Sequence, residues 1–245
     1  MSRTVLTNVR TFAVGVDLTG NSNKIELSTE VEDKDATNYA SQGWKEVMGG
    51  LASAEISGEG QWEALDPTKV DDASWAQLGG VGPWSVSANN AANVGDLVYF
   101  TNAMRADYKA FDAVGEVAPW TSTAKSSWPL VRGQFAHPPG TARTTSGNGT
   151  GLNLGAVAAG KRLYAALHVL SAAGTTPSLT ARVESSVDNT FASPTTRLTF
   201  TAATAPGGQI LRTVGTAITD TWWRVAWTIS GTTPSFLFVA ALGIQ

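Results

Sequence analysis

The stretch Trp222-Trp-Arg-Val-Ala-Trp-Thr-Ile229 decides the fold class of this 245-residue chain. Its residues alternate in character, so that one face collects Trp223, Val225, Trp227 and Ile229. Side chains two residues apart lie on the same face of a β-strand. The alternation therefore predicts a strand that buries Trp223 and Trp227 in the core.

The run that follows, Phe236-Leu-Phe-Val-Ala-Ala-Leu242, is apolar on both faces. A strand of this kind needs cover on both sides, which is typical of a central strand or of a strand between two sheets. We expect residues 236–242 to hold such a position.

The pentapeptide Gly-Thr-Thr-Pro-Ser occurs at residues 174–178 and again at 231–235. In both copies a segment with Gly and Pro separates two strand-like runs, which predicts two β-hairpins. The repeat also favours a strand over a helix at residues 161–170. With further runs at 197–202 and 209–214, this half has about six or seven strands, as in a β-sandwich.

Residues 1–136 have a mixed pattern. Asp66-Pro67 precedes a run that ends at Gly79 and predicts a short helix, with Asp66 as its cap and Pro67 at its first position. Val70, Trp75 and Leu78 would form the side that packs on a sheet. Strand-like runs occur at residues 14–18, 24–31, 52–62, 96–100 and 108–113. The predicted fold is therefore mainly β, with one short helix.

The charge of the chain is distributed unevenly. Residues 1–136 have 10 Lys and Arg and 17 Asp and Glu, a net charge of −7, whereas residues 137–245 have 7 and 3, a net charge of +4. The change coincides with residues 137–150, which are rich in Gly, Thr and Pro. We therefore expect a β domain at 1–136, a linker at 137–150 and a β-sandwich at 151–245. The scattered basic residues do not form the basic face of a nucleic-acid-binding protein.

Residues that support catalysis or metal binding are scarce. The chain has no cysteine and two histidines, His137 and His168, which excludes a thiol nucleophile and a metal site built from His and Cys. Gly147-Asn-Gly-Thr-Gly151 lacks the Lys-Ser/Thr of a phosphate loop and is interpreted as a flexible linker. The acidic residues 30–35 lack the spacing of a calcium loop and are interpreted as a solvated loop. We expect no enzymatic activity, no cofactor and no metal.

The sequence also lacks membrane signals. No run approaches the roughly 18 apolar residues of a membrane helix, and the first ten residues lack the apolar core of a signal peptide. We expect a protein that is made and assembled in the cytoplasm, without a membrane partner.

One segment resembles a known family. It runs Lys24-Ile-Glu-Leu-Ser-Thr-Glu-Val-Glu-Asp-Lys-Asp-Ala-Thr-Asn-Tyr-Ala-Ser-Gln-Gly-Trp-Lys-Glu-Val-Met-Gly-Gly-Leu-Ala-Ser-Ala-Glu-Ile-Ser57. The order is a strand, an acidic loop with Thr and Ser, Gly-Trp-Lys-Glu, Gly-Leu, and a strand that ends in Ile-Ser. This order resembles the signature of the major tail tube proteins of long-tailed (siphovirus-type) bacteriophages, and weaker pieces extend the resemblance over residues 10–135.

The resemblance implies a structural role in the virion. Tail tube proteins of this family form hexameric rings that stack into a hollow tube, through which DNA leaves the capsid without being bound specifically. The resemblance implies a tail-tube-type β-sandwich or barrel, self-association, contacts with tail terminator, tape measure and tail tip proteins, and a location in the viral tail after assembly in the host cytoplasm. The acidic excess of residues 1–136 would then partly face the lumen.

The resemblance also implies which residues join the rings. The loop that reaches the next ring corresponds to residues 29–50 of this chain. The assembly residues within it would be Asp35, Thr37, Tyr39, Gly43, Trp44, Lys45, Glu46 and Gly50.

Two alternatives stay open at this level. Residues 151–245 would be either an immunoglobulin-like outer domain or an extension that completes the sheets of the tube domain. The alternative function is a non-enzymatic carbohydrate-binding β-sandwich module of a phage or bacterial surface protein, because nine Trp could supply a surface for sugar stacking. The opposing interpretation places Trp223 and Trp227 in the core and has Trp44, Trp62 and Trp75 pack helices or loops onto the sheets.

Overall fold

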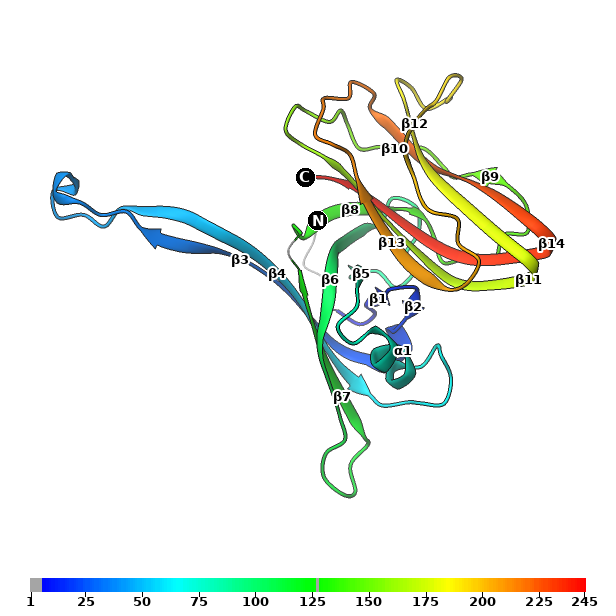
Figure 1. Cartoon of the computed structure of the whole chain (residues 1–245), viewed down its shortest axis with the longest axis horizontal. Coiled ribbons are helices and arrows are strands. Elements are labelled where there is room, and N and C mark those ends of the chain that lie inside the picture. The colour runs from blue at the N-terminus through cyan, green and yellow to red at the C-terminus, as the bar shows by residue number, and fades with distance from the viewer. Residues whose placement is uncertain (1–5, 127) are drawn as a thin grey trace.

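The computed structural model describes residues 6–126 and 128–245 (Figure 1). The first half contains β1 (Arg10–Ala13), β2 (Val16–Asp17), β3 (Ser22–Asp35), β4 (Val47–Gln61), α1 (Val70–Gln77), β5 (Val81–Ser87), β6 (Leu97–Ala110), β7 (Pro119–Ser126) and β8 (Val131–His137). The second half contains β9 (Gly147–Asn148), β10 (Leu152–Asn153), β11 (Leu163–Ser186), β12 (Thr195–Thr199), β13 (Gly207–Arg212) and β14 (Trp222–Ile244). Two short 3-10 helices lie at Thr19–Asn21 and Tyr39–Ser41. The predicted class, mainly β with one short helix, is confirmed.

The strands form one branched antiparallel sheet, and its two main arms separate at β6. One edge of β6 pairs with β5, which continues to β1 and β2. The other edge pairs with β8 near the start of β6 and with β7 further along. The sheet continues from β8 to β14 and β11, and from β7 to β4 and β3. The two branches thus lead to different ends of the molecule (Figure 1).

The strands β11 and β14 pair with each other along almost their whole length. Leu163 opposes Ile244 at one end of this ribbon, and Ser186 opposes Trp222 at the other. The ribbon bends at the two Gly-Thr-Thr-Pro-Ser segments, where its register shifts. The runs on either side of each segment therefore do not pair with each other, and the prediction of two hairpins is wrong. Each copy of the repeat instead pairs with the other copy.

Both bends require glycine. Gly174 has a φ of 113° and Gly231 a φ of 120°. A Cβ on Gly174 would lie 2.7 Å from the carbonyl oxygen of Thr233, and a Cβ on Gly231 would lie 2.8 Å from that of Thr176. Since an L side chain would be both strained and in collision with the facing backbone, the repeat encodes a matched pair of bends.

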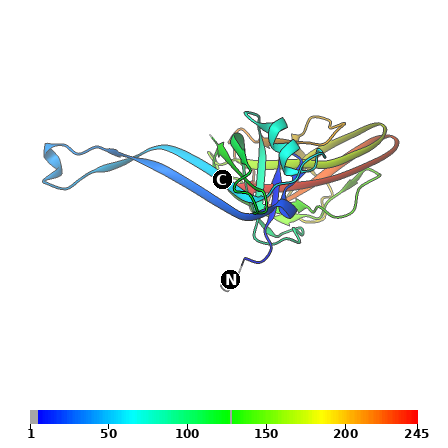
Figure 2. The same ribbon diagram turned by 90° about the horizontal axis from the view of Figure 1, so that it is seen from below.

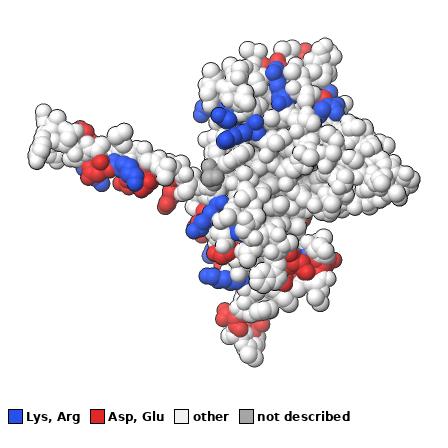
Figure 3. Space-filling view, in the orientation of Figure 1, with Lys and Arg blue, Asp and Glu red and all other residues white. Residues whose placement is uncertain are grey.

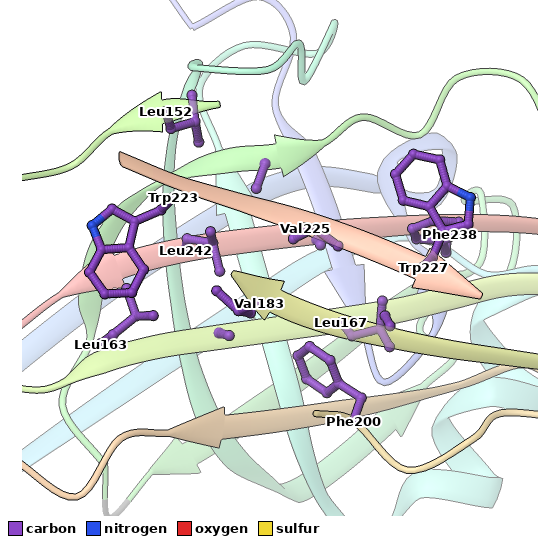
Figure 4. Close-up of a cluster of buried hydrophobic side chains, with 14 of the residues drawn as sticks. Leu152, Leu163, Leu167, Val183, Phe200, Trp223, Val225, Trp227, Phe238 and Leu242 are labelled. Carbon is purple, nitrogen blue, oxygen red and sulfur yellow. The ribbon is translucent and has the colours of Figure 1, made fainter. Parts of the chain in front are cut away.

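The C-terminal half of β14 lies between two hydrophobic cores. Phe236, Phe238, Ala240 and Leu242 face the core enclosed by the bent ribbon, which also contains Leu167, Phe200, Trp223 and Trp227 (Figure 4). Val239 and Ala241 face a second core, formed with Phe12, Val98, Phe100, Val131, Phe135, Tyr164 and Ala166. The expected position of residues 236–242 and the burial of Trp223 and Trp227 are confirmed. The second core joins residues from both halves of the chain.

The helix α1 differs from its prediction in its start and in its exposed side. It begins at Val70, and Asp66 does not cap it, because the Asp66 carboxylate accepts a hydrogen bond from the Thr68 N–H at 2.8 Å in a local turn. Val70, Ala73 and Ser74 form the buried side. Trp75 and Leu78 lie away from that side and are exposed, so the predicted packing of these two residues is wrong.

Residues 147–151 are packed instead of flexible. Gly147 pairs with Trp227 in the β9–β14 ladder, and a Cβ on Gly147 would lie 2.9 Å from Cζ2 of the Trp227 ring. The Gly149 N–H donates to the carbonyl oxygen of Val225 at 2.7 Å. The glycines thus allow the backbone to lie directly on β14, and the expectation of a flexible segment is wrong here. The division of the chain into domains at residues 137–150 stays a prediction.

Candidate assembly surfaces

The strands β3 and β4 form a hairpin that projects far from the body (Figures 1 and 2). β4 pairs with β7 only over Ala54–Gln61. Beyond Ala54 the hairpin therefore has two strands and no third one within the described residues. The acidic residues 30–35 and half of residues 29–50 belong to these strands, so the expectation of a loop is wrong outside residues 36–46. The ladder persists to the pair Asp35 and Val47, because it satisfies the backbone groups of both strands.

The tip of the hairpin is shaped by local hydrogen bonds. A carboxylate oxygen of Asp35 accepts from the Thr37 N–H at 2.8 Å, and these contacts with Thr37 hold the pKa of Asp35 below its usual range. The Thr37 hydroxyl accepts from the Glu46 N–H at 2.9 Å, which ties the two sides of the tip together. Gly43 has a φ of 83° and completes the turn. Asp35, Thr37 and Gly43 thus maintain the shape of the tip.

The tip exposes two large aromatic side chains. Tyr39 is fully exposed and Trp44 is 80% exposed, so Trp44 does not pack against a sheet in the isolated chain. Behind them, Lys34 and Lys45 form ion pairs with Glu32 and Asp33 of β3. A Cβ on Gly50 would lie 3.1 Å from the carbonyl oxygen of Glu32, so Gly50 lets the two strands approach closely. The eight residues expected to take part in assembly therefore lie together on the outer part of one hairpin, from Asp35 to Gly50. Their role in assembly stays a prediction.

The second half of the chain contains two partly buried ion-pair networks. Burial works against the charged form of Glu184, but hydrogen bonds from Arg182 and Arg224 outweigh it and hold the pKa of Glu184 below its usual range. Asp220 accepts hydrogen bonds from the Ser185 hydroxyl and from Arg197, and its pKa is lowered in the same way. Glu184 and Asp220 are thus both paired with arginines of the same half.

A second charged surface, which the sequence did not reveal, lies at one end of this half. Lys161, Arg162 and Arg212 form no ion pair with a described carboxylate, and we call these three residues the basic patch. The signal in the sequence was only the net charge of residues 137–245. The strand pairing that brings residue 212 next to residues 161 and 162 is not visible in it.

His137 and His168 are both buried, the first with its Nδ1 at 2.9 Å from the carbonyl oxygen of Phe238. Arg105 lies beneath α1, where burial lowers its pKa to about 10. Within residues 6–126 and 128–245, no group of three or more His, Cys, Asp and Glu is placed to hold a metal ion. None of the described helices is long and apolar enough to span a membrane.

No family model and no curated protein matches the chain. Among solved structures, a chain from the virion of the native gene transfer agent particle matches with a TM-score of 0.42 and 20% identity, over 52% of this chain and all of that one. A chain from the baseplate of the anti-feeding prophage matches with a TM-score of 0.41 and 11% identity, over 54% of this chain and 97% of that one. The Dit protein of phage SPP1, described as a hub of the adsorption apparatus, matches with a TM-score of 0.36 and 9% identity, over 97% of this chain and 99% of that one.

These structural neighbours come from a virion, a baseplate and a phage adsorption apparatus. Their TM-scores lie below 0.5 and their identities do not exceed 20%, so they assign no function and no residue role to this chain.

Proposed function

We propose that this chain is a non-enzymatic structural subunit of a bacteriophage tail, which self-associates into rings that stack into a tube. The observation that carries the proposal is the β3–β4 hairpin. A two-stranded hairpin is at best marginally stable in water, and its unpaired edges expose backbone donors and acceptors. A hairpin of this length therefore needs a partner surface that the isolated chain does not supply.

The side chains of the hairpin support the same proposal. Aromatic residues contribute most to the stability of protein interfaces, and Tyr39 and Trp44 stand exposed at its tip. A hairpin on one side of a subunit that binds a different surface of the next copy makes a head-to-tail contact. Contacts of this type generate rings when they close and filaments when they do not.

In the proposed tube, DNA passes through the lumen and is not bound specifically. Tail terminator, tape measure and tail tip proteins would contact the ends and the interior of the tube, and the assembled chain would be located in the virion. The second half of the chain would lie on the outside of the tube or complete its wall.

A shortened hairpin tests the proposal. Replacing residues 31–52 with Asn-Gly joins Glu30 to Ser53, its cross-strand partner, through a two-residue turn of the type that hairpins favour. We expect this variant to remain a folded monomer under conditions in which the wild-type chain forms rings or tubes in negative-stain images.

A matched variant keeps the full hairpin and replaces only Tyr39 and Trp44 with Ser. It should also lose assembly, because it lacks the aromatic contacts at the tip although its hairpin has the full length. Tubes of normal appearance from the shortened variant would overturn the proposed role of the hairpin.

A further inference from the structure

The three residues of the basic patch are held together around one loop. Arg212 of β13 is the cross-strand partner of Tyr164 of β11. Tyr164 lies two positions after Arg162, which directly precedes β11. Arg162 donates a hydrogen bond from Nη1 to the carbonyl oxygen of Thr213 at 3.3 Å. The Gly160 N–H donates to the carbonyl oxygen of Gly215 at 3.0 Å, which fixes Lys161 beside the same loop. The patch is therefore a defined surface and not a chance grouping in the sequence.

No Asp or Glu of residues 137–245 pairs with the patch. Of the three acids in residues 137–245, Glu184 is paired with Arg182 and Arg224, and Asp220 with Arg197. The third, Asp188, accepts hydrogen bonds from the backbone N–H and the hydroxyl of Thr190. The patch thus has three of the charges of this half that no ion pair neutralises; the others among the described residues are Arg143 and Asp188.

The outer hairpin has the complementary charge. Residues 29–50 contain five acids and two lysines, a net charge of −3. Both lysines are paired internally, Lys34 with Glu32 and Lys45 with Asp33, which leaves Glu30, Asp35 and Glu46 without a basic partner among the described residues. Figure 3 shows acidic side chains along the hairpin, with lysines between them, and basic side chains on the second half.

The two surfaces do not meet within one chain, because the hairpin points away from the second half (Figure 1). We propose that the basic patch of one copy receives the acidic outer hairpin of a second copy. The inference rests on the proposed function and names the surface on which the hairpin docks. Complementary charges of this kind steer association and fix the register of a contact, in addition to the burial of Tyr39 and Trp44 at the tip.

A pair of charge-reversed variants tests this contact. The first is K161E/R212E, which makes the patch acidic and keeps the hairpin acidic. The second is E30K/E46K, which makes the hairpin basic and keeps the patch basic; both acids are exposed and unpaired. We expect each variant alone to need a protein concentration about tenfold higher than the wild-type chain for assembly, because like charges then face each other.

The decisive experiment is an equimolar mixture of the two variants. In the mixture, the acidic hairpin of the first meets the basic patch of the second, and the basic hairpin of the second meets the acidic patch of the first. We expect assembly to recover to within a few-fold of the wild-type concentration and to weaken at about 1 M salt, where the screening length falls to about 3 Å. A matched control, K109E, reverses an exposed lysine of β6 outside both surfaces and should assemble normally.

Each outcome separates the inference from the proposed function. If the wild-type chain assembles and the mixture does not recover, the docking of the hairpin on the patch is wrong, while the tube proposal stands. Normal assembly of K161E/R212E alone has the same meaning. A wild-type chain that forms no rings or tubes contradicts the proposed function itself and the interface with it. Thermal unfolding of each variant as a monomer checks whether the substitutions leave the fold intact.

Discussion

The Ser85 hydroxyl oxygen lies 2.8 Å from Nε2 of His168, in a fully buried contact that joins β5 of the first half to β11 of the second. The other ring nitrogen of His168, Nδ1, accepts a hydrogen bond from the Gly15 N–H at 3.3 Å. His168 must therefore be neutral, with its proton on Nε2 and donated to Ser85. Burial lowers the pKa of His168 to about 3, and burial, with the nearby Arg143, lowers the pKa of His137 to about 4.

The first prediction is that acid begins to destabilise the monomer below about pH 6.5, before most carboxylates titrate. Both histidines have a lower pKa in the folded chain than the roughly 6.5 of the unfolded chain, so the unfolded state binds protons first. Stability is complete above pH 6.5 and falls as the pH decreases toward the folded values. Between about pH 5.5 and 4.5, each histidine should contribute a slope of about 1.4 kcal/mol per pH unit.

Urea unfolding at a series of pH values measures this slope. Replacing His168 with Gln should reduce the number of protons taken up on unfolding by about one, whatever the change in stability at pH 7. An unchanged slope in H168Q and in the matched variant H137Q would show that the two histidines do not titrate on unfolding in this window.

The second prediction concerns the paired bends of β11 and β14. Substituting Gly174 or Gly231 with Ala should destabilise the monomer by about 2 kcal/mol or more, because a side chain there is strained and collides with backbone. Gly207 is a matched control, since a Cβ on it meets nothing within 4 Å and its φ is not in the left-handed region. Denaturant midpoints measure both effects. Equal, small effects at all three positions would contradict the proposed role of the repeat.

The sequence predicted the parts of this fold that follow from local patterns. The alternation at 222–229 and the run at 236–242 correctly indicated a buried face and a strand between two cores. The repeat was misinterpreted because Gly and Pro mark a bend equally well in a hairpin and in a continuous ribbon, and only the partner strand distinguishes the two. In residues 147–151 the glycines were taken for flexibility, whereas they serve the close contact with Trp227.

Of the two candidate assembly surfaces, one was identified from the sequence and the other was missed. The residues from Asp35 to Gly50 were identified by resemblance, and the structure places them on one exposed hairpin. The basic patch was missed because Lys161 and Arg162 lie far from Arg212 in the chain, and strand register alone brings them together.

The third prediction separates the tip of the hairpin from the core. Trp44→Ala should abolish assembly and leave the thermal midpoint of the monomer nearly unchanged, since Trp44 is 80% exposed. Trp223→Ala, which truncates a fully buried ring, should cost about 3–5 kcal/mol of stability. Differential scanning calorimetry of both variants compares the two. A large loss of stability in the Trp44 variant would place that side chain in the core of the monomer.

The fourth prediction is that the inner wall of the tube has a net negative charge. Residues 1–136 have a net charge of −7, and a weakly repelling wall lets DNA slide where a basic wall would retain it by the release of counterions. We expect an assembled structure to show more Asp and Glu than Lys and Arg of this half on the inner wall. A channel lined by Lys and Arg, with the acids only on the outside, would contradict the prediction.

The central claim is self-assembly through the β3–β4 hairpin, and electron cryo-microscopy of the purified wild-type chain tests it most directly. The account predicts rings or stacked tubes, with the hairpin of each subunit ordered against a neighbouring copy and Trp44 buried in that contact. Monodisperse monomers at all concentrations, together with binding to glycans on an array, would contradict it and favour a carbohydrate-binding module.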